Sequence, residues 1–250
     1  MVLQAQEGRL TTSAVRVLVA TAVPAERDAV AAAFPGGTTE VRLPAATLLR
    51  TAGGYDLLAA GVGPAPAAAA TATALTVAAL EGRPYALVVS AGIAGGFQPA
   101  APVGSLVVAD EIVAADLGAE TADGFVPVTE LGFGTVSHRP PDPLVRATAE
   151  ATGARPGAVL TVSTVTGSAA RAADLCARHP HALAEAMEGF GVAEAAAAHG
   201  VPVLEIRAVS NPVGPRDRDA WRIPAALDAL TGAFGKLAPV LESWNPHDHR

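Results

Sequence analysis

Two polar residues follow an apolar, strand-like run near the end of the chain. The run VPVLEIRAVS, residues 201–210, is rich in Val, Leu and Ile, and Asn211 and Pro212 follow it directly. Because proline cannot donate to a central β-ladder, we expect the strand to end there. Ser210 and Asn211 then lie at the end of a strand, where open α/β sheets carry their binding sites. A plain turn opened by Asn-Pro is the alternative interpretation.

Three further residues have side chains suited to chemistry. Glu26 comes shortly after the first apolar run, VRVLVATAV, although an acid in a first helical turn is usually a partner of the helix dipole. Met187 and Glu188 lie in AEAMEGFGVAEAAAAHG, residues 184–200, which predicts an alanine-rich helix that ends at Gly200. Inside such a helix a methionine ordinarily fills the core and a glutamate ordinarily faces solvent.

The run SAGIAGG, residues 90–96, forms a glycine-rich segment at the end of another apolar stretch. It lacks the Lys-Ser/Thr pair of a P-loop and the glycine spacing of a dinucleotide-binding turn. We therefore expect a strand over 85–97 that enters a glycine loop. The glycines there, Gly92 among them, would let the backbone approach a ligand or a neighbouring element closely.

Composition excludes several classes of protein. The 250 residues carry a net charge of −7 without a basic cluster, so no nucleic-acid partner is expected. A single cysteine, Cys176, excludes an intramolecular disulfide and a cysteine-rich metal site, and it fits a reducing, cytoplasmic compartment. Segments 57–80 and 86–109 are uncharged, but they are weakly apolar or broken by Gly and Pro. We expect them to be buried and expect no membrane partner.

Apolar runs alternate with helical patterns along the chain, which is typical of an α/β fold. We expect a flexible segment over residues 1–14 and a single domain over 15–250. The expected strands cover 15–23, 85–97, 105–116, 158–166 and 201–210, with a hairpin in 39–61. The expected helices cover 24–34, 64–81, 142–152, 169–178, 184–200 and 223–243. Residues 117–140 show no period and are expected to form a long loop.

Six motifs occur together in one order and at one set of spacings: TAVPAERDAV, GVGPAPAAAA, VVSAGIAGGF, VGSLVVADEIV, EAMEGFGVAEAA and IRAVSNPVG. With them, residues 15–243 resemble the nucleoside phosphorylase and nucleosidase superfamily, specifically its hydrolytic branch of methylthioadenosine/S-adenosylhomocysteine nucleosidases. The resemblance implies a three-layer α/β sandwich with a mixed central sheet and no cofactor or metal. It also implies a homodimer or larger homo-oligomer, in which the loop 117–140 is expected to reach the neighbouring subunit.

The resemblance also implies a role for each candidate residue. Cleavage of an N-glycosidic bond passes through an oxocarbenium-like sugar, so a site must hold the ribose, activate water and stabilise the departing base. Glu188 matches the carboxylate that binds the ribose hydroxyls, and Glu26 matches the acid that takes a proton from the attacking water. The remaining matches are Met187 beneath the ribose, Val165 and Thr166 at the purine, and Trp221 over the 5′ side of the nucleoside.

Glu26 favours hydrolysis over phosphorolysis. Phosphorylases of the superfamily bind phosphate with arginines, one of which comes from the first loop. The corresponding TAVPAE here offers a carboxylate and no cation, and a carboxylate would repel phosphate. We therefore expect water to be the attacking nucleophile.

Asn211 stands where the adenine-cleaving nucleosidases carry an aspartate. Its amide presents both a donor and an acceptor, and it can donate to O6 of a 6-oxopurine, which an ionised aspartate would repel. We expect Ser210 to brace this amide and the base to be hypoxanthine or guanine. Within the branch that the chain resembles, this combination is typical of futalosine hydrolases, which release hypoxanthine during menaquinone biosynthesis. Asparagine is no ordinary general acid, so no residue is assigned to protonate the leaving base.

Several alternatives stay open at this point. The substrate could be methylthioadenosine, S-adenosylhomocysteine or aminodeoxyfutalosine, and a 6-oxopurine phosphorylase is disfavoured by Glu26. A nucleoside-binding regulatory protein on the same scaffold is the non-enzyme alternative, although binding alone needs no water-activating carboxylate. For the carboxyphenyl group of futalosine, the candidate partner is Arg216, Arg218 or Arg222. Solvent-facing surface charges are the alternative interpretation of these arginines.

Overall fold

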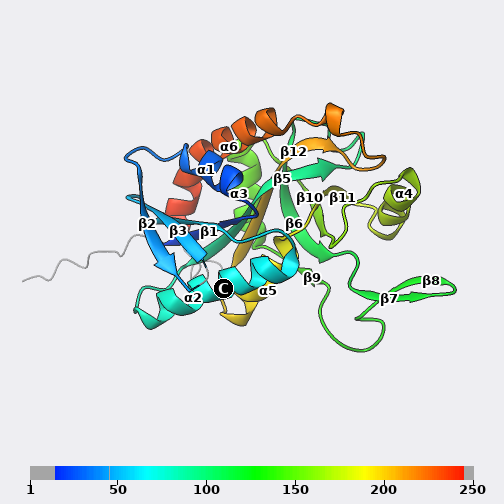
Figure 1. Ribbon diagram of the computed structural model, residues 1–250, viewed down its shortest axis with the longest axis horizontal. Coiled ribbons are helices and arrows are strands. Elements are labelled where there is room, and N and C mark those ends of the chain that lie inside the picture. The colour runs from blue at the N-terminus through cyan, green and yellow to red at the C-terminus, as the bar shows by residue number, and fades with distance from the viewer. Residues whose placement is uncertain (1–14, 45, 245–250) are drawn as a thin grey trace, which may run out of the picture.

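A mixed β-sheet forms the centre of the protein, and helices cover both of its faces (Figure 1). The computed structural model describes residues 15–44 and 46–244, so the expected flexible segment 1–14 lies outside the described residues. The strands of the central sheet are β1 (Val17–Thr21), β2 (Thr38–Leu43), β3 (Ala46–Thr51), β4 (Tyr55–Ala59), β5 (Leu87–Gly96), β6 (Leu106–Ala114), β9 (Ser137–His138), β10 (Arg155–Thr161), β11 (Ala182–Ala186) and β12 (Val203–Pro212). They lie in the order β11-β10-β6-β12-β5-β1-β4-β3-β2, and β9 pairs with β6. Strand β12 runs parallel to β5 and antiparallel to β6.

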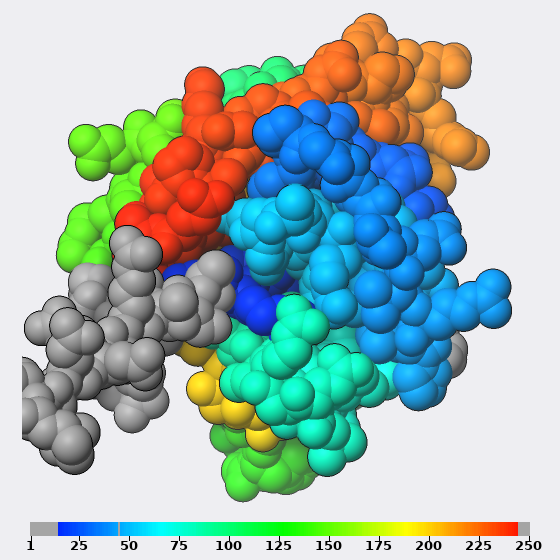
Figure 2. Space-filling view, turned by 90° about the vertical axis from the view of Figure 1, so that its left-hand side faces the viewer, coloured from blue at the N-terminus to red at the C-terminus, as the bar shows by residue number. Residues whose placement is uncertain are grey.

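The helices form two layers on either side of this sheet. One face is covered by α1 (Pro24–Ala31), α3 (Asp142–Thr152) and α6 (Ile223–Ser243), and the other by α2 (Pro64–Leu80) and α5 (Gly189–Ala198) (Figure 1). A view turned by 90° shows α6 in red on one side of the blue N-terminal strands and α2 in cyan-green on the other (Figure 2). The short helix α4 (Ala169–Arg178) follows β10. The expected three-layer α/β sandwich with a mixed sheet is confirmed.

Strand β1 shows why its sequence, VLVAT, is apolar at nearly every position. Val17 and Val19 belong to the buried cluster beneath α1, α3 and α6. Leu18 and Ala20 belong to the cluster beneath α2 and α5. Successive side chains of a strand point to opposite faces of the sheet, so a strand that is covered on both faces needs apolar residues throughout.

At one end the sheet closes on itself. Strand β11 pairs along its length with β10 and also with the last two residues of β5, Gly95 and Gly96. The same two residues of β5 pair with Asn211 and Pro212 at the end of β12. The ends of three strands therefore meet at Gly95 and Gly96, and this junction is where a site can form.

The glycine-rich segment 90–96 belongs to β5 itself, so the expected glycine loop is wrong. The glycines instead allow a close approach of other chain segments to the strand. A Cβ atom at Gly96 would lie 2.2 Å from the carbonyl oxygen of Ala101 and 2.6 Å from the side chain of Val209. Glycine is thus required here for packing inside the sheet.

The expected helix over 184–200 is wrong at its beginning. Residues 182–186 form β11, and α5 begins only at Gly189, so Met187 and Glu188 lie in the junction between strand and helix. Alanine has no strong strand preference, and β11 forms because its neighbours β10 and β5 supply its hydrogen bonds. The expected strand 158–166 likewise ends early, at Thr161.

The expected long loop 117–140 contains regular structure. A hairpin of β7 (Gly118–Thr121) and β8 (Gly124–Pro127) projects from the body of the molecule, and β9 follows it (Figure 1). Asp123-Gly124 is a dipeptide typical of tight hairpin turns, and Gly124 has a φ of 120°. The Asp-Gly dipeptide was therefore a signal in the sequence for this hairpin.

Helices α2 and α5 pack with almost no space between their backbones. A Cβ atom at Gly191 of α5 would lie 2.1 Å from the carbonyl oxygen of Pro64, the first residue of α2. We predict that Gly191→Ala lowers the free energy of unfolding by about 1–3 kcal/mol, since the backbones must separate. Urea denaturation measures this change.

The matched control is Gly232→Ala in α6, where nothing lies within 4 Å of the added Cβ atom. We expect this second substitution to raise stability by up to about 1 kcal/mol through helix propensity. Equal effects of the two substitutions would contradict the close approach at Gly191.

Candidate active site

A cavity of about 340 Å³ opens where the ends of β5, β11 and β12 meet. This volume lies in the range of small-molecule binding sites. Its walls contain eight of the predicted site residues, namely Glu26, Val165, Thr166, Met187, Glu188, Ser210, Asn211 and Trp221. Residues from five separate parts of the sequence are therefore brought to one place.

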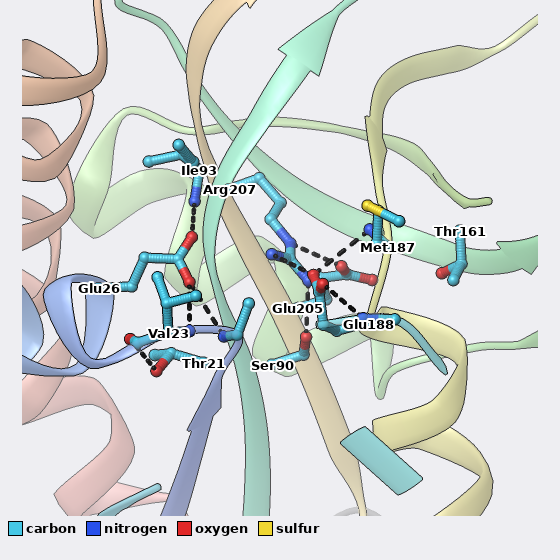
Figure 3. A network of polar contacts seen from close by, with 12 residues as sticks. Thr21, Val23, Glu26, Ser90, Ile93, Thr161, Met187, Glu188, Glu205 and Arg207 are labelled. Carbon is cyan, nitrogen blue, oxygen red and sulfur yellow. Dashed lines mark hydrogen bonds and ion pairs between the residues drawn. The ribbon is translucent and has the colours of Figure 1, made fainter. Parts of the chain in front are cut away.

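Glu26 is held rigidly at the start of α1. Its Oε2 accepts hydrogen bonds from the backbone amides of Ala22, at 2.9 Å, and Val23, at 3.2 Å, and its Oε1 accepts one from Ile93, at 2.8 Å (Figure 3). Burial raises the pKa of Glu26, and the charge of Arg207 offsets part of this effect. A fixed carboxylate with a raised pKa is suited to accept a proton from water.

Arg207 is the centre of the charged groups beneath the cavity, and it is only 1% exposed. Its Nε lies 2.8 Å from Oε1 of Glu205, and its Nη2 donates to Oγ of Ser90 at 3.0 Å. Its Nη1 forms an ion pair with Oε2 of Glu188 at 3.5 Å. Burial favours the neutral form of Arg207, but the charges of Glu205, Glu188 and Glu26 outweigh this and raise its pKa.

Gly92 lies behind this charged cluster instead of in the cavity wall. A Cβ atom at Gly92 would lie 2.6 Å from Oε1 of Glu26 and 2.7 Å from Nη1 of Arg207. The glycine thus leaves room for the carboxylate and the guanidinium to pack against β5. Its predicted contact with a ligand stays a prediction.

Glu188 is buried and not solvent-facing, because it lies at the strand-to-helix junction. Its Oε1 accepts a hydrogen bond from the backbone amide of Gly63 at 3.2 Å, and its Oε2 accepts one from Met187 at 3.3 Å. Each carboxylate oxygen has a second lone pair. Glu188 can therefore also accept hydrogen bonds from hydroxyls of a ligand in the cavity.

Ser210 and Asn211 lie at a bulge in β12, between Val209 and Asn211, which redirects the chain at the strand end. The hydroxyl of Ser210 lies 2.8 Å from Oδ1 of Asn211, and Nδ2 of Asn211 donates to the carbonyl of Pro212 at 3.0 Å. Because a backbone carbonyl only accepts, the NH₂ end of the amide must face it. The second hydrogen of Nδ2 is therefore available as a donor at the cavity.

Trp221 and Arg216 form another part of the cavity wall. The guanidinium of Arg216 lies 5.4 Å from the ring centroid of Trp221, and that of Arg218 lies 5.9 Å away. Of the three candidate arginines, Arg216 is the one that lines the cavity. Arg222 instead donates to the backbone carbonyls of Asp219 and Trp221.

Sequence reasoning gave no role to three buried residues of the site. Arg207 was part of a motif, but its partner Glu205 was not recognised, although residues two apart in a strand share one face. Glu185 lines the cavity and accepts hydrogen bonds from the amide of Thr166, at 2.8 Å, and from its hydroxyl. The incorrect prediction of a helix over 184–200 hid the role of Glu185. The direction of its side chain is set by strand β11, which that prediction did not contain.

Residues 16–238 match the family model of the phosphorylase superfamily. The chain belongs to this superfamily. Within the superfamily it is 78% identical to the futalosine hydrolase of Streptomyces coelicolor over 93% of this chain and 99% of that enzyme. It is 48% identical to the futalosine hydrolase of Acidothermus cellulolyticus over 89% of this chain and 90% of that enzyme.

Solved structures of a futalosine hydrolase and of a nucleosidase share the fold. A futalosine hydrolase mutant of Helicobacter pylori superposes with a TM-score of 0.77, at 16% identity, over 90% of this chain and 99% of that chain. The 5′-methylthioadenosine/S-adenosylhomocysteine nucleosidase of Neisseria meningitidis, in complex with methylthio-immucillin-A, gives 0.75 at 20% identity over 89% and 97%. At these identities the structures support the fold alone.

Within residues 15–44 and 46–244, no three His, Cys, Asp or Glu side chains are grouped to hold a metal ion. In the same part of the chain, no helix combines the length and apolar character needed to cross a membrane.

We predict that Arg207→Met lowers the free energy of unfolding by about 3–5 kcal/mol, because Glu205 and Glu188 then remain buried without a countercharge. The double variant Arg207→Met/Glu205→Gln should recover part of this loss, since one of the two buried charges is removed. Urea denaturation at pH 7 measures both.

The exposed Arg146 of α3 offers a matched control, and Arg146→Met should change stability by less than about 0.5 kcal/mol. If Arg207→Met proved no more harmful than Arg146→Met, the central place of the Arg207 cluster would be refuted.

Proposed function

We propose that the protein hydrolyses the N-glycosidic bond of futalosine and releases hypoxanthine. The observation that carries the proposal is the 78% identity to a futalosine hydrolase over 99% of that enzyme's length. The cavity supports it with a carboxylate suited to activate water, a second carboxylate suited to bind hydroxyls, and an amide donor suited to O6 of a purine. Consistent with the rest of the proposal, we place the reaction in menaquinone biosynthesis in the cytoplasm.

In the proposed mechanism, Glu26 takes a proton from a water molecule whose oxygen attacks C1′ of the ribose. Glu188 accepts hydrogen bonds from the ribose hydroxyls, and the negative charges of both glutamates favour the positive charge that develops on the sugar. The electron pair of the C1′–N9 bond leaves with the purine, which takes up a proton from water. Asn211 stabilises the departing base by donating from Nδ2 to O6. Met187 is the proposed support beneath the ribose.

The charges around the cavity support water, and not phosphate, as the nucleophile. Glu26 and Glu188 line the cavity, and both would repel an anion. Arg207 lies buried beneath the cavity, and Glu205, Glu188 and Glu26 already compensate its charge. A phosphorylase would need a free cation beside Glu26 to bind the phosphate, whereas the cavity arginine Arg216 lies beside Trp221.

We further propose that the protein forms a homodimer or larger homo-oligomer through the segment around β7 and β8. Leu117, Leu131 and Phe133 of this segment are 42%, 43% and 63% exposed. Val62 and Val165 at the cavity are also exposed, at 53% and 37%, and a neighbouring subunit would cover such apolar side chains. Sedimentation of the wild type and of Phe133→Asp tests this: a wild type that sediments as a monomer would refute it.

Product analysis tests the proposed reaction. The wild type should release hypoxanthine from futalosine at the same rate with and without phosphate, as measured by chromatography. Glu26→Gln should lower kcat by about 10²–10⁴-fold, because an amide cannot take the proton from water. Formation of the 1-phosphate of the 5′-substituted ribose, or full activity of Glu26→Gln, would exclude the mechanism. No release of base from futalosine would exclude the function.

Arg216 is the proposed partner of the carboxylate on the 5′ substituent of futalosine, since it lines the cavity beside Trp221. We predict that Arg216→Ala raises KM for futalosine about tenfold and leaves KM for inosine unchanged, because inosine has no such carboxylate. Arg218→Ala is the control, since Arg218 also lies over Trp221 but does not belong to the cavity wall. Equal changes of KM for both substrates would contradict this assignment.

A further inference from the structure

Glu185 is a buried carboxylate in the cavity wall to which hydrolysis assigns no task. It is 5% exposed and lies on β11. Strands β11 and β12, the latter carrying Asn211, both pair with the end of β5. Its Oε1 accepts a hydrogen bond from the amide of Thr166 at 2.8 Å, and its Oε2 accepts one from the hydroxyl of Thr166. A carboxylate has about four acceptor positions, so Glu185 has capacity for a further donor.

The strand register places Glu185 and Asn211 on either side of one glycine. Glu185 of β11 is paired with Gly95 of β5, and Asn211 of β12 is paired with the same Gly95. Residues directly paired across a sheet share one face, and neighbouring strands lie about 4.8 Å apart. The Cα atoms of Glu185 and Asn211 are therefore about 10 Å apart on the same face of the sheet.

Gly95 keeps the space between these two side chains free. All three residues line the cavity, and a Cβ atom at Gly95 would lie 2.9 Å from Val213 and 3.4 Å from Nδ2 of Asn211. Two polar side chains thus lie on either side of a flat backbone segment that carries no side chain. A flat, bicyclic base fits such a segment with one polar group at each end of its edge.

The two side chains offer opposite hydrogen-bonding functions. Asn211 presents the free hydrogen of Nδ2, which Pro212 orients, whereas an ionised Glu185 can only accept. A 6-oxopurine has an acceptor, O6, next to a donor, N1–H. A 6-aminopurine has the reverse, an amino donor next to the acceptor N1. The pair is complementary to the 6-oxopurine and mismatched to the 6-aminopurine at both positions.

We propose that Glu185 accepts a hydrogen bond from N1–H of the base and, together with Asn211, selects 6-oxopurine over 6-aminopurine nucleosides. The inference rests on the proposed function and deepens it by assigning the residue that determines the base. Burial raises the pKa of Glu185, but the amide and hydroxyl of Thr166 both stabilise its ionised form, which is the form that accepts. Glu185 acts on specificity and takes no part in the bond cleavage itself.

A purely structural role for Glu185 has a different signature. Through Thr166 it also fixes the segment that follows β10, and loss of that contact would impair all substrates equally. Glu185→Gln retains the size of the side chain and an acceptor for Thr166, but it replaces one acceptor by a donor suited to N1 of a 6-aminopurine. Thr166→Val removes the hydroxyl contact and leaves the carboxylate in place.

The experiment compares kcat/KM of the wild type and these two variants on futalosine and aminodeoxyfutalosine. We expect the wild type to favour futalosine. Glu185→Gln should shift the ratio of the two kcat/KM values at least tenfold toward aminodeoxyfutalosine, since a charged hydrogen bond is lost and a new donor is gained. Thr166→Val should lower both values by a similar factor. Equal losses on both substrates with Glu185→Gln, or a ratio shifted as strongly by Thr166→Val, would overturn the proposal.

Calorimetric binding of free hypoxanthine and adenine separates this inference from the proposed function, because it requires no turnover. The wild type should bind hypoxanthine more tightly than adenine, and Glu185→Gln should lose at least tenfold of that preference. If the wild type shows this preference but does not cleave futalosine, the proposed function fails and the role of Glu185 stands. If it cleaves futalosine and Glu185→Gln keeps the full preference, the role of Glu185 fails alone.

Discussion

The burial of one guanidinium among three carboxylates is the constraint on which the site depends. Arg207 is 1% exposed, and the charges of Glu205, Glu188 and Glu26 surround it. A buried charge is strongly unfavourable unless it is paired, so the arginine and the glutamates can be buried only together. Glu26 lies in the first turn of α1 and Glu188 directly precedes α5, and their attraction to the same cation favours both positions at one end of the sheet.

Glycines, which have no side chain, are as important to this arrangement as the charged residues. Gly92 leaves room for Glu26 and Arg207 against β5, and Gly191 allows α5 to approach the start of α2. Gly95 lies where β5 pairs with both β11 and β12, so the sheet closes there without filling the cavity. The high alanine content has the same effect on a larger scale, because small side chains let α2 and α5 pack closely against each other.

The sequence predicted the fold well where local signals define an element. The helices 142–152 and 223–243 begin with a proline in the first turn and have the expected bounds. Residues 184–186 of β11 fall within the helix predicted over 184–200, because alanine is a good helix former and only the pairing with β10 and β5 makes this segment a strand. Motif resemblance identified the residues of the cavity wall. The partners of Arg207 and the position of Glu185 follow from strand register, which a motif does not contain.

The pH dependence of kcat/KM for futalosine tests most directly the claim that Glu26 is the buried base of the reaction. The base must be ionised to act, and burial raises the pKa of Glu26 above its ordinary value of 4.5. We predict that kcat/KM of the folded wild type falls tenfold per pH unit below an apparent pKa above 4.5, and that the residual activity of Glu26→Gln lacks this decline. A wild-type kcat/KM that stays constant down to pH 4.5, while circular dichroism shows a folded protein, would contradict the account.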